Sequence, residues 1–262
     1  MAAGIRNVLI TGSNGLIGRT LAAAFSGKFN VTGFDVTQPG ADNNVPTTVA
    51  DGSDLDAIMP AFRGVDAVVH LAANAPVETP WPDVLKNNIA TTHNVYEAAR
   101  QNGVKRLVFA SSNHAVGLFE NDEPYKSIVA GNYGDLEPGK FQRVDNTVPV
   151  RPDSDYGISK VFGEATGRYY SERFGLEVAC LRIGTVNRIN SPVQSVRHLA
   201  TWLSHRDLIQ LVEKSLTAPL KFEIFYGVSN NTWRFWDIEH AANKIGFSPV
   251  DNAEDWRDQL RS

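Results

Sequence analysis

The chain has 262 residues, of which 42% are hydrophobic and 21% charged, a composition typical of a folded globular protein. A chain of this length buries enough surface to fold without disulfides or structural metals. Lys and Arg total 25 against 29 Asp and Glu, so the formal net charge is −4, which argues against nucleic acid as a partner. The single cysteine, Cys180, excludes a disulfide within this chain and a cysteine-based zinc site.

The sequence carries no recognisable targeting or membrane signal. Residues 1–11 do not combine a charged start with an apolar run of signal-peptide length. No stretch approaches the ~18 apolar residues that a membrane-spanning helix needs. We therefore expect a cytoplasmic protein that has no membrane partner.

Short apolar runs alternate with amphipathic stretches from the start of the chain. In chain order the pattern predicts strands at 5–10, 31–34, 47–50, 67–71, 107–110 and 178–183. Helices are expected after the first strand to about Gly27, then at 53–62 with Ser53 as N-cap, at 82–102 and at 155–174. In 82–102, the stripe expected to face the sheet is Leu85, Asn88/Ile89, Thr92, Val95 and Ala99. The alternation predicts an α/β fold, a Rossmann-type doubly wound parallel sheet with helices on both faces.

Two regions depart from this alternation. Residues 117–152 form a long polar and aromatic segment with four prolines, and loops of this length in compact domains usually bind ligands or act as lids. From residue 184 the pattern is mixed, with a helix near 204–215, a strand near 222–226 and a last helix near 236–245. We interpret this tail as a small cap. Within it, Trp233, Phe235 and Trp236 either wall a pocket or anchor the tail by packing.

A glycine-rich turn follows the first predicted strand. It reads Thr11-Gly12-Ser13-Asn14-Gly15-Leu16-Ile17-Gly18, with the spacing G-x-x-G-x-x-G. Glycines at the first two positions let backbone N–H groups approach a pyrophosphate, and the third lets helix and strand pack closely. The turn therefore predicts a dinucleotide site that uses Gly12, Asn14, Gly15, Leu16, Ile17 and Gly18. A tight turn with helix-packing glycines is the alternative.

Acidic residues follow the second and third strands. Asp35 ends the second strand, where a carboxylate accepts both ribose hydroxyls and repels a 2′-phosphate, so NAD is preferred over NADP. An ordinary turn at the strand end is the alternative for Asp35. Asp51 and Gly52 follow the third strand and suit the adenine rim, although this pair is also a common turn.

Tyr156 and Lys160 are four residues apart, which places both on one face of the predicted helix 155–174. A phenol ionises with a pKa of ~10, and lowering this to ~7 requires roughly 4 kcal/mol of differential stabilisation. Lys160 and a positively charged nicotinamide ring can supply it. Ser112, just after the fifth strand, can donate a hydrogen bond to the reacting oxygen. The spacing Y-x-x-x-K alone is a weak signal, but it gains weight downstream of the glycine turn and Ser111-Ser112.

Together with His70-Leu71-Ala72-Ala73, these motifs resemble the extended short-chain dehydrogenase/reductase superfamily over about residues 5–185. Within it, the chain is similar to uronate dehydrogenases and the related archaeal-type NAD-dependent glucose-6-phosphate dehydrogenases. The segments that carry this closer resemblance are 110–117, 181–185, 201–207 and 225–229. It implies a single domain over 1–262, in which 1–183 bind NAD and 184–262 mostly form a substrate-binding cap.

The resemblance also implies roles for individual residues. Tyr156 would take the proton of the anomeric hydroxyl while hydride leaves C1, and Lys160 would hold the nicotinamide ribose. Further cofactor contacts would come from Leu71, Ala72, Ala73, Asn88 and Ile183, although Asn88 can instead brace the loop after the fourth strand. The sugar would be lined by Asn74, Ser112, Asn113, His114, Tyr156 and Thr185.

Arg197 lies five residues before Trp202, where these families carry an arginine for the anionic end of the sugar. Its planar fork suits a carboxylate, a phosphate or a sulfonate, while a solvated loop arginine is the alternative.

His70 is interpreted as structural, and no set of His, Asp and Glu residues has the spacing of metal ligands. The chain departs from the uronate dehydrogenases at 74–78, which is one residue longer, and at 117–152, which is closer in length to the glucose-6-phosphate branch.

The resemblance implies an NAD-dependent oxidation at C1 of a cyclic hexose with an anionic C6 group, a uronate first, then glucose 6-phosphate or sulfoquinovose. A nucleotide-sugar epimerase or dehydratase uses the same Tyr/Lys pair, but little chain follows Lys160 to enclose a nucleotide sugar. A non-enzymatic NAD sensor is the third hypothesis, although such proteins often lack the catalytic pair. Related enzymes pair through the helices at 82–102 and 155–174, so we expect a homo-oligomer.

Overall fold

The computed structural model describes residues 4–40 and 43–260. Its centre is a parallel sheet of seven strands in the order β3-β2-β1-β4-β5-β6-β7. The order runs outward from β1 in both directions, which is the doubly wound arrangement that the sequence predicts. The strands are β1 (Asn7–Thr11), β2 (Asn30–Asp35), β3 (Thr47–Val49), β4 (Ala67–His70), β5 (Arg106–Ser112), β6 (Glu177–Ile183) and β7 (Phe222–Gly227).

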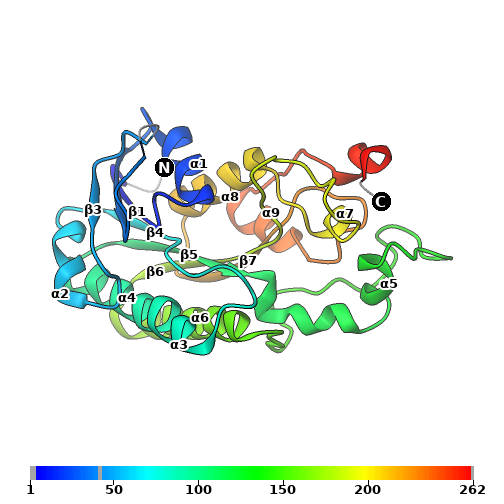
Figure 1. Cartoon of the computed structure of the whole chain (residues 1–262), viewed down its shortest axis with the longest axis horizontal. Coiled ribbons are helices and arrows are strands. Elements are labelled where there is room, and N and C mark those ends of the chain that lie inside the picture. The colour runs from blue at the N-terminus through cyan, green and yellow to red at the C-terminus, as the bar shows by residue number, and fades with distance from the viewer. Residues whose placement is uncertain (1–3, 41–42, 261–262) are drawn as a thin grey trace.

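Helices cover both faces of the sheet (Figure 1). On one face lie α2 (Leu55–Ile58), α3 (Trp81–Asp83), α4 (Thr91–Gln101) and α6 (Asp155–Phe174). On the other lie α1 (Leu16–Phe25), α8 (His205–Thr217) and α9 (Glu239–Ile245). The short helices α5 (Tyr125–Val129) and α7 (His198–Thr201) lie at the end of the molecule beyond the sheet, near the C-terminus.

The sheet separates two hydrophobic cores. Successive side chains of β1 point to opposite faces, so Val8 and Ile10 pack with α1 and α8, whereas Leu9 packs with α4. Every residue of β5 is buried, as expected for a central strand that is covered on both faces. The pairing of β5 with β4 and β6 fixes where its last residue, Ser112, leaves the sheet.

Two local predictions are wrong in detail. The helix predicted at 53–62 begins with Asp54 as its N-cap, which accepts from Ala57 N, and not with Ser53. The helix predicted at 82–102 contains a π-helical stretch, η2 (Val84–Ala90). A π turn takes more residues than an α turn, so Val84 is buried in the position expected for Leu85, which is 47% exposed.

The segment 117–152 contains more regular structure than the loop expected from its composition. It includes most of η3 (Asn113–Asn121), a 3-10 helix that starts directly after β5, and α5. The tail is also more than a cap, because β7 forms the seventh strand and α8 packs against β5. Trp236 is fully buried and stacks on Tyr226 of β7, which favours anchoring of the tail over a pocket wall.

In the described ranges, no helix is both long and apolar enough to cross a membrane.

Candidate functional site: a dinucleotide cleft with a tyrosine and a lysine

The turn between β1 and α1 has a backbone that only glycine tolerates at two positions. Gly12 has a φ of +68°, and a Cβ there would lie 2.9 Å from the backbone nitrogen of Ala72. A Cβ on Gly18 would lie 2.3 Å from the Gly12 carbonyl oxygen. Gly15 is the N-cap of α1 and has no side chain to bond the first-turn N–H groups. Those groups therefore stay available for an anion such as a pyrophosphate.

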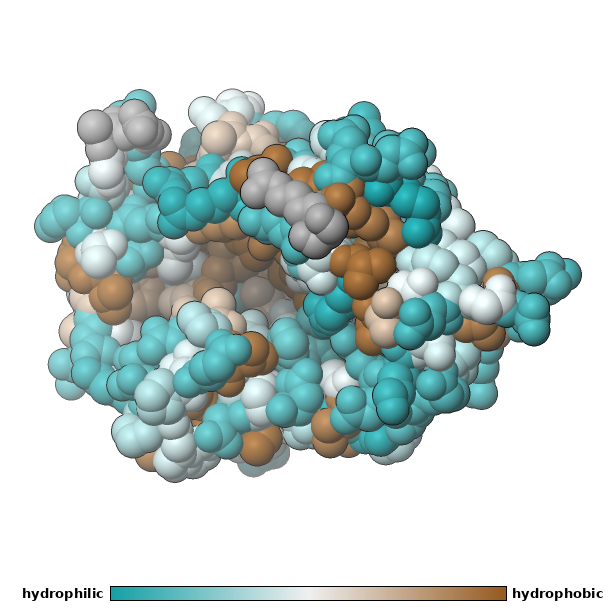
Figure 2. Space-filling view, turned by 45° about the vertical axis from the view of Figure 1, so that its right-hand side comes forward, coloured by the Kyte–Doolittle hydropathy of each residue, from teal (hydrophilic) through white to brown (hydrophobic). Residues whose placement is uncertain are grey.

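Two cavities meet at this turn, and both include Gly12 and Gly15 in their walls. The first has a volume of about 380 Å³ and extends over the ends of β2 and β3. Figure 2 shows a hollow with a hydrophobic floor and a mostly hydrophilic rim. The residues predicted for the cofactor that line the first cavity are Gly12, Asn14, Gly15, Asp35, Asp51, Gly52, Leu71, Ala72 and Ala73, together with Asn74, which was expected to contact the sugar.

Asp35 is held at the end of β2 by its own loop. Its Oδ2 accepts from Asn14 N at 2.9 Å, and its Oδ1 accepts from Thr37 N and Thr37 Oγ1, both at 3.1 Å. These bonds orient the carboxylate at the cavity wall, where a ribose would meet it. Asp51 bonds Ser53 and forms an ion pair with Lys86 at 2.8 Å, which lowers the pKa of Asp51 to about 2.

His70 stabilises the start of the loop after β4, which lines both cavities. Thr11 Oγ1 accepts from Leu71 N and Ala72 N, both at 3.1 Å, so its own proton is free to be donated to His70 Nδ1 at 2.7 Å. The other ring nitrogen of His70 then donates to Thr92 Oγ1 at 3.1 Å. Burial and the charge of Lys160 lower the pKa of His70 to about 3. His70 is therefore a neutral, structural residue, as the sequence suggests.

Asn88 lies behind the loop that follows β4. Its Oδ1 accepts from Asn74 N at 2.7 Å, and its Nδ2 donates to Asn74 O and Ser159 Oγ, both at 3.1 Å. Both donor protons of the amide are therefore used within the protein. This geometry favours the bracing role over a direct contact with the cofactor, and Asn88 is in the wall of neither cavity.

The second cavity, of about 410 Å³, continues from the glycine turn to the ends of β5 and β6. It is lined by Leu16, Ile17 and Gly18 of the turn and by the candidate catalytic residues Ser112, Tyr156 and Lys160. Asn113, His114, Ile183 and Thr185 complete the predicted residues in its wall. Side chains from α6 and from the ends of two strands thus converge on the space where a nicotinamide and its substrate would meet.

Burial sets the proton affinities of the tyrosine and lysine. The Lys160 Nζ lies 5.2 Å from the centre of the Tyr156 ring. Burial raises the pKa of Tyr156 to about 12, against a lowering effect of the hydrogen bond with Ser112. Burial lowers the pKa of Lys160 to about 8. The phenol therefore needs a nearby positive charge to act as a base near neutral pH.

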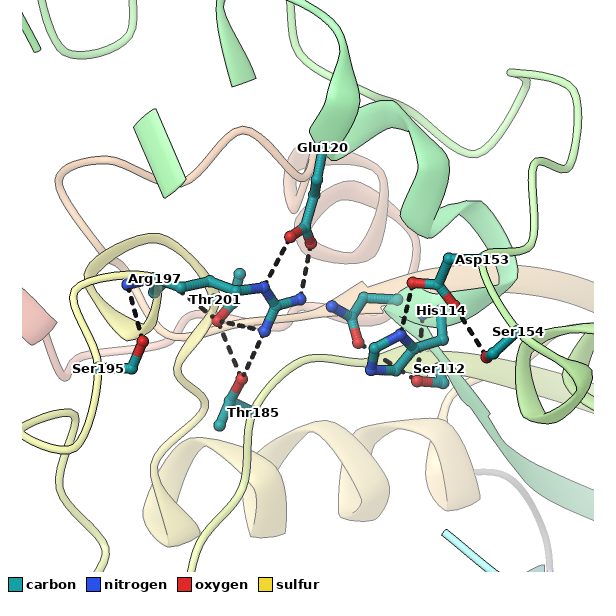
Figure 3. A network of polar contacts seen from close by, with 10 residues as sticks. Ser112, His114, Glu120, Asp153, Ser154, Thr185, Ser195, Arg197 and Thr201 are labelled. Carbon is teal, nitrogen blue, oxygen red and sulfur yellow. Dashed lines mark hydrogen bonds and ion pairs between the residues drawn. The ribbon is translucent and has the colours of Figure 1, made fainter. Parts of the chain in front are cut away.

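His114 is held against the same cavity by Asp153. Its Nδ1 lies 2.7 Å from Asp153 Oδ2, and Ser154 Oγ donates to Asp153 Oδ1 at 2.9 Å (Figure 3). The His114 ring meets the Tyr156 ring edge to face, with the ring centres 5.8 Å apart. This pair fixes both the direction of the imidazole and the tautomer that faces the cavity.

Arg197 lies beside the second cavity and is not among the residues of its wall. Its Nη1 donates to Thr185 Oγ1 at 3.3 Å, and Thr185 does line the cavity. The fork of Arg197 is closed by Glu120, with Nε–Oε2 and Nη2–Oε1 distances of 2.6 Å each (Figure 3). Glu120 is 77 residues away in sequence, and no local pattern marks the pairing, so sequence reasoning missed it.

Several other cavity residues were missed as well. Phe34, Val36, Thr37, Asn87 and Thr91 line the first cavity, and Ala75, Ala110, Ser111, Gly184 and Val186 the second. Most of them are adjacent in sequence to a predicted residue, and this adjacency could have identified them.

Within the described part of the chain, no group of three or more His, Cys, Asp or Glu residues could hold a metal ion.

The glycine turn, the strand-end aspartate and the Tyr156–Lys160–Ser112 cluster define an NAD-binding enzyme of Rossmann type. The chain belongs to the NAD dependent epimerase/dehydratase family, whose model matches residues 8–206.

Relatives with named activities cover nearly the whole chain. The chain is 35% identical to an NAD-dependent glucose-6-phosphate dehydrogenase of Haloferax volcanii, over 95% of each protein. It is 36% identical to a uronate dehydrogenase of Pseudomonas putida, over 95% of this chain and 86% of that protein. The structure resembles a uronate dehydrogenase mutant from Agrobacterium tumefaciens complexed with NAD, with a TM-score of 0.82, 33% identity and coverage of 98% of this chain and 89% of that one.

Proposed function

We propose that this protein oxidises C1 of a cyclic hexose that carries an anionic group at C6, with NAD as hydride acceptor and an aldonolactone as product. The leading substrate is a uronate such as galacturonate or glucuronate, and glucose 6-phosphate and sulfoquinovose are the alternatives. The observation that carries the proposal is the convergence of Ser112, Tyr156 and Lys160 on the cavity that begins at the glycine turn. The similarity to uronate and glucose-6-phosphate dehydrogenases supports a sugar as the substrate.

The residues of the cavity divide the reaction between them. The phenolate oxygen of Tyr156 takes the proton of the C1 hydroxyl as the electron pair of the C1–H bond leaves as hydride. NAD, when bound, accepts this hydride. Ser112 donates a hydrogen bond to the C1 oxygen as it becomes a carbonyl, and the ammonium of Lys160 stabilises the phenolate. Base catalysis by a positioned group is typically worth ~10²–10⁴-fold in rate.

The remaining wall residues are proposed to orient the sugar. Asn113, His114 and Thr185 line the second cavity, and Asn74 lines the first, between Ala73 and Ala75, which line the second. The segment 184–262 contributes Gly184, Thr185 and Val186 to this wall. We assign to it the substrate-side half of the site, although β7 also completes the sheet and α8 packs against it.

A homo-oligomer is part of the proposal. Tyr169 and Phe174 of α6 and Leu85 of η2 are 57%, 44% and 47% exposed, and α6 packs beside η2. Large exposed apolar side chains on neighbouring helices are typical of a surface that a second copy covers. Light scattering should give at least twice the monomer mass for the wild type and a lower mass for Tyr169→Glu. A monomeric wild-type protein would contradict the oligomer but would not contradict the proposed activity.

The test of the activity is NADH formation with galacturonate, glucuronate, glucose 6-phosphate and sulfoquinovose, each with the wild type and Tyr156→Phe. We expect turnover of at least one sugar, and a loss of ~10²–10⁴-fold in kcat in the variant with unchanged NAD affinity. If the wild type oxidises none of the four sugars, the proposal is wrong.

A further inference from the structure

Glu120 is positioned between the catalytic loop and the arginine expected to bind the anionic end of the sugar. It lies near the end of η3, the 3-10 helix that begins one residue after Ser112. Its carboxylate meets the Arg197 guanidinium through two parallel hydrogen bonds of 2.6 Å (Figure 3). The two side chains are only 15% and 27% exposed, so water screens their attraction less than on the open surface.

The rest of the guanidinium is also occupied by protein groups. Nη1 donates to Thr185 Oγ1 at 3.3 Å and to Thr201 Oγ1 at 3.4 Å. The Asn113 amide, with its nitrogen toward Ile183 O, accepts from Arg197 Nη2 at 2.7 Å. The two threonine hydroxyls are 2.9 Å apart and share one N–H of Nη1, so four of the five N–H bonds of Arg197 are directed at acceptors of the protein. A bidentate anion from a substrate can reach the Nε/Nη2 edge only by replacing Glu120.

The arrangement around the pair permits such a replacement. Glu120 and Arg197 come from irregular segments, because η3 contains a kink at Val116 and Arg197 is the N-cap residue of the four-residue helix α7. The pair can therefore open without breaking a strand or a long helix. Asn113 and Thr185 contact Arg197 and line the cavity with Tyr156, so the fork lies one side chain away from the sugar site.

We propose that Glu120 is a specificity-determining residue that competes with the anionic group of the substrate for the fork of Arg197. Its carboxylate has the chemistry of the C6 carboxylate of a uronate. It occupies the Nε/Nη2 edge of the guanidinium, which a bidentate C6 carboxylate would also use. It holds Arg197 in its binding position, and it weakens the binding of anionic sugars because two anions cannot share one fork. The inference rests on the proposed function, since it deepens the choice of substrate.

The kinetic test compares Glu120→Gln, which removes the charge at constant shape, with Asp122→Asn as matched control. Asp122 pairs with Arg151 on the same loop, outside the cavity wall. Galacturonate and galactose are the substrates, because they differ only at C6. We expect Glu120→Gln to lower the KM for galacturonate about tenfold, with kcat changed less than about twofold and no effect on galactose. Asp122→Asn should leave all values unchanged. An unchanged or higher galacturonate KM in Glu120→Gln would overturn the proposal.

A binding test separates this inference from the proposed activity. Inorganic phosphate is titrated by calorimetry into the protein saturated with NADH, so that the pyrophosphate site is already filled. Glu120→Gln should bind phosphate about tenfold more tightly than the wild type, and Glu120→Gln with Arg197→Ala should lose this gain. Equal phosphate affinity of Glu120→Gln and the wild type would refute the competition, whether or not any sugar is oxidised.

Discussion

At the scale of single residues, the chemistry depends on how the protein moves the pKa of Tyr156. Burial raises the pKa of this phenol to about 12 and lowers that of Lys160 to about 8. The two shifts have one cause, since the buried wall disfavours whichever form of each group is charged. Lys160 alone therefore does not make Tyr156 a base at neutral pH, and a bound cationic nicotinamide is needed as well.

The first prediction concerns this titration. A raised pKa means that the proton is kept to higher pH, so the base form of Tyr156 is lost as the pH falls. NAD places positive charge beside the phenol and should shift its ionisation to lower pH. The ultraviolet absorbance of the phenolate, taken as the difference between wild type and Tyr156→Phe, measures this with and without NAD. Identical titration curves in the two conditions would contradict the assigned role.

At the residue scale, the sequence predicts which side chains come together where their placement follows from a local motif. The glycine turn and the spacing of Tyr156 and Lys160 are set by neighbours within one turn and one helix. Tyr156, Lys160 and every turn residue predicted to contact the cofactor line the cavities. The environment of Arg197 could not be predicted in this way. Its partner Glu120 is brought to it only by the path of the chain through η3 and α7.

At the scale of elements, the loop after β4 is fixed by buried polar groups. Thr11 Oγ1 bonds two of its N–H groups, His70 bonds Thr11, and Asn88 bonds Asn74 from behind. Buried polar networks of this kind stabilise one conformation when every member is satisfied. The loop can then form a well-defined wall of both cavities.

The second prediction is a pH dependence of stability that arises from His70. Its pKa is lowered to about 3, so below about 6.5 the unfolded chain takes up a proton that the folded one refuses. The free energy of unfolding should therefore fall as the pH decreases through this window, by up to about 1.4 kcal/mol per pH unit. Urea unfolding at several pH values measures it. In His70→Asn the decline should be shallower, and parallel curves for the two proteins would argue against this source.

The third prediction concerns the attachment of α6 to the sheet. Glu164, one turn after Lys160, accepts from Arg182 Nε and Nη2 of β6 at 2.9 Å each, and both side chains are almost fully buried. Glu164→Gln leaves the Arg182 charge without its partner, which typically costs about 3–5 kcal/mol. The control is Glu172→Gln on the same helix, whose ion pair with Arg168 is exposed and contributes little. Equal melting temperatures of the two variants would contradict the structural role.

Element prediction failed where packing overrode local preference. The apolar periodicity of 82–102 is compatible with an α-helix, but the chain adopts the π turn at Val84–Ala90, which places Asn88 under the loop after β4. No local sequence pattern marks the extra residue in this turn. The π turn is stabilised by the hydrogen bonds of Asn88 with Asn74, which lies in a different segment of the chain. The boundaries of α6, by contrast, follow from a local cap, since Ser154 accepts from Gly157 N and Gly175 ends the helix in the left-handed region.

At the scale of the whole molecule, the parallel sheet explains why the site lies where it does. The strands β1, β4, β5 and β6 all end at the same edge, so the residues that follow them meet in two adjoining cavities. This arrangement could be predicted from the alternation of strands and helices. The shape of the substrate side could not, because η3, α5 and α7 are short elements held by contacts between distant segments.

Transfer of hydride from C1 of an anionic hexose to NAD is the step on which all the proposed residue roles depend. The most direct measurement uses galacturonate deuterated at C1, with mass spectrometry of the cofactor and the sugar product. We expect the NADH to gain one deuterium, the product to be the C1 lactone, and Tyr156→Phe to form neither at a comparable rate. NADH without deuterium, or no NADH from any of the anionic hexoses tested, would contradict hydride transfer from C1.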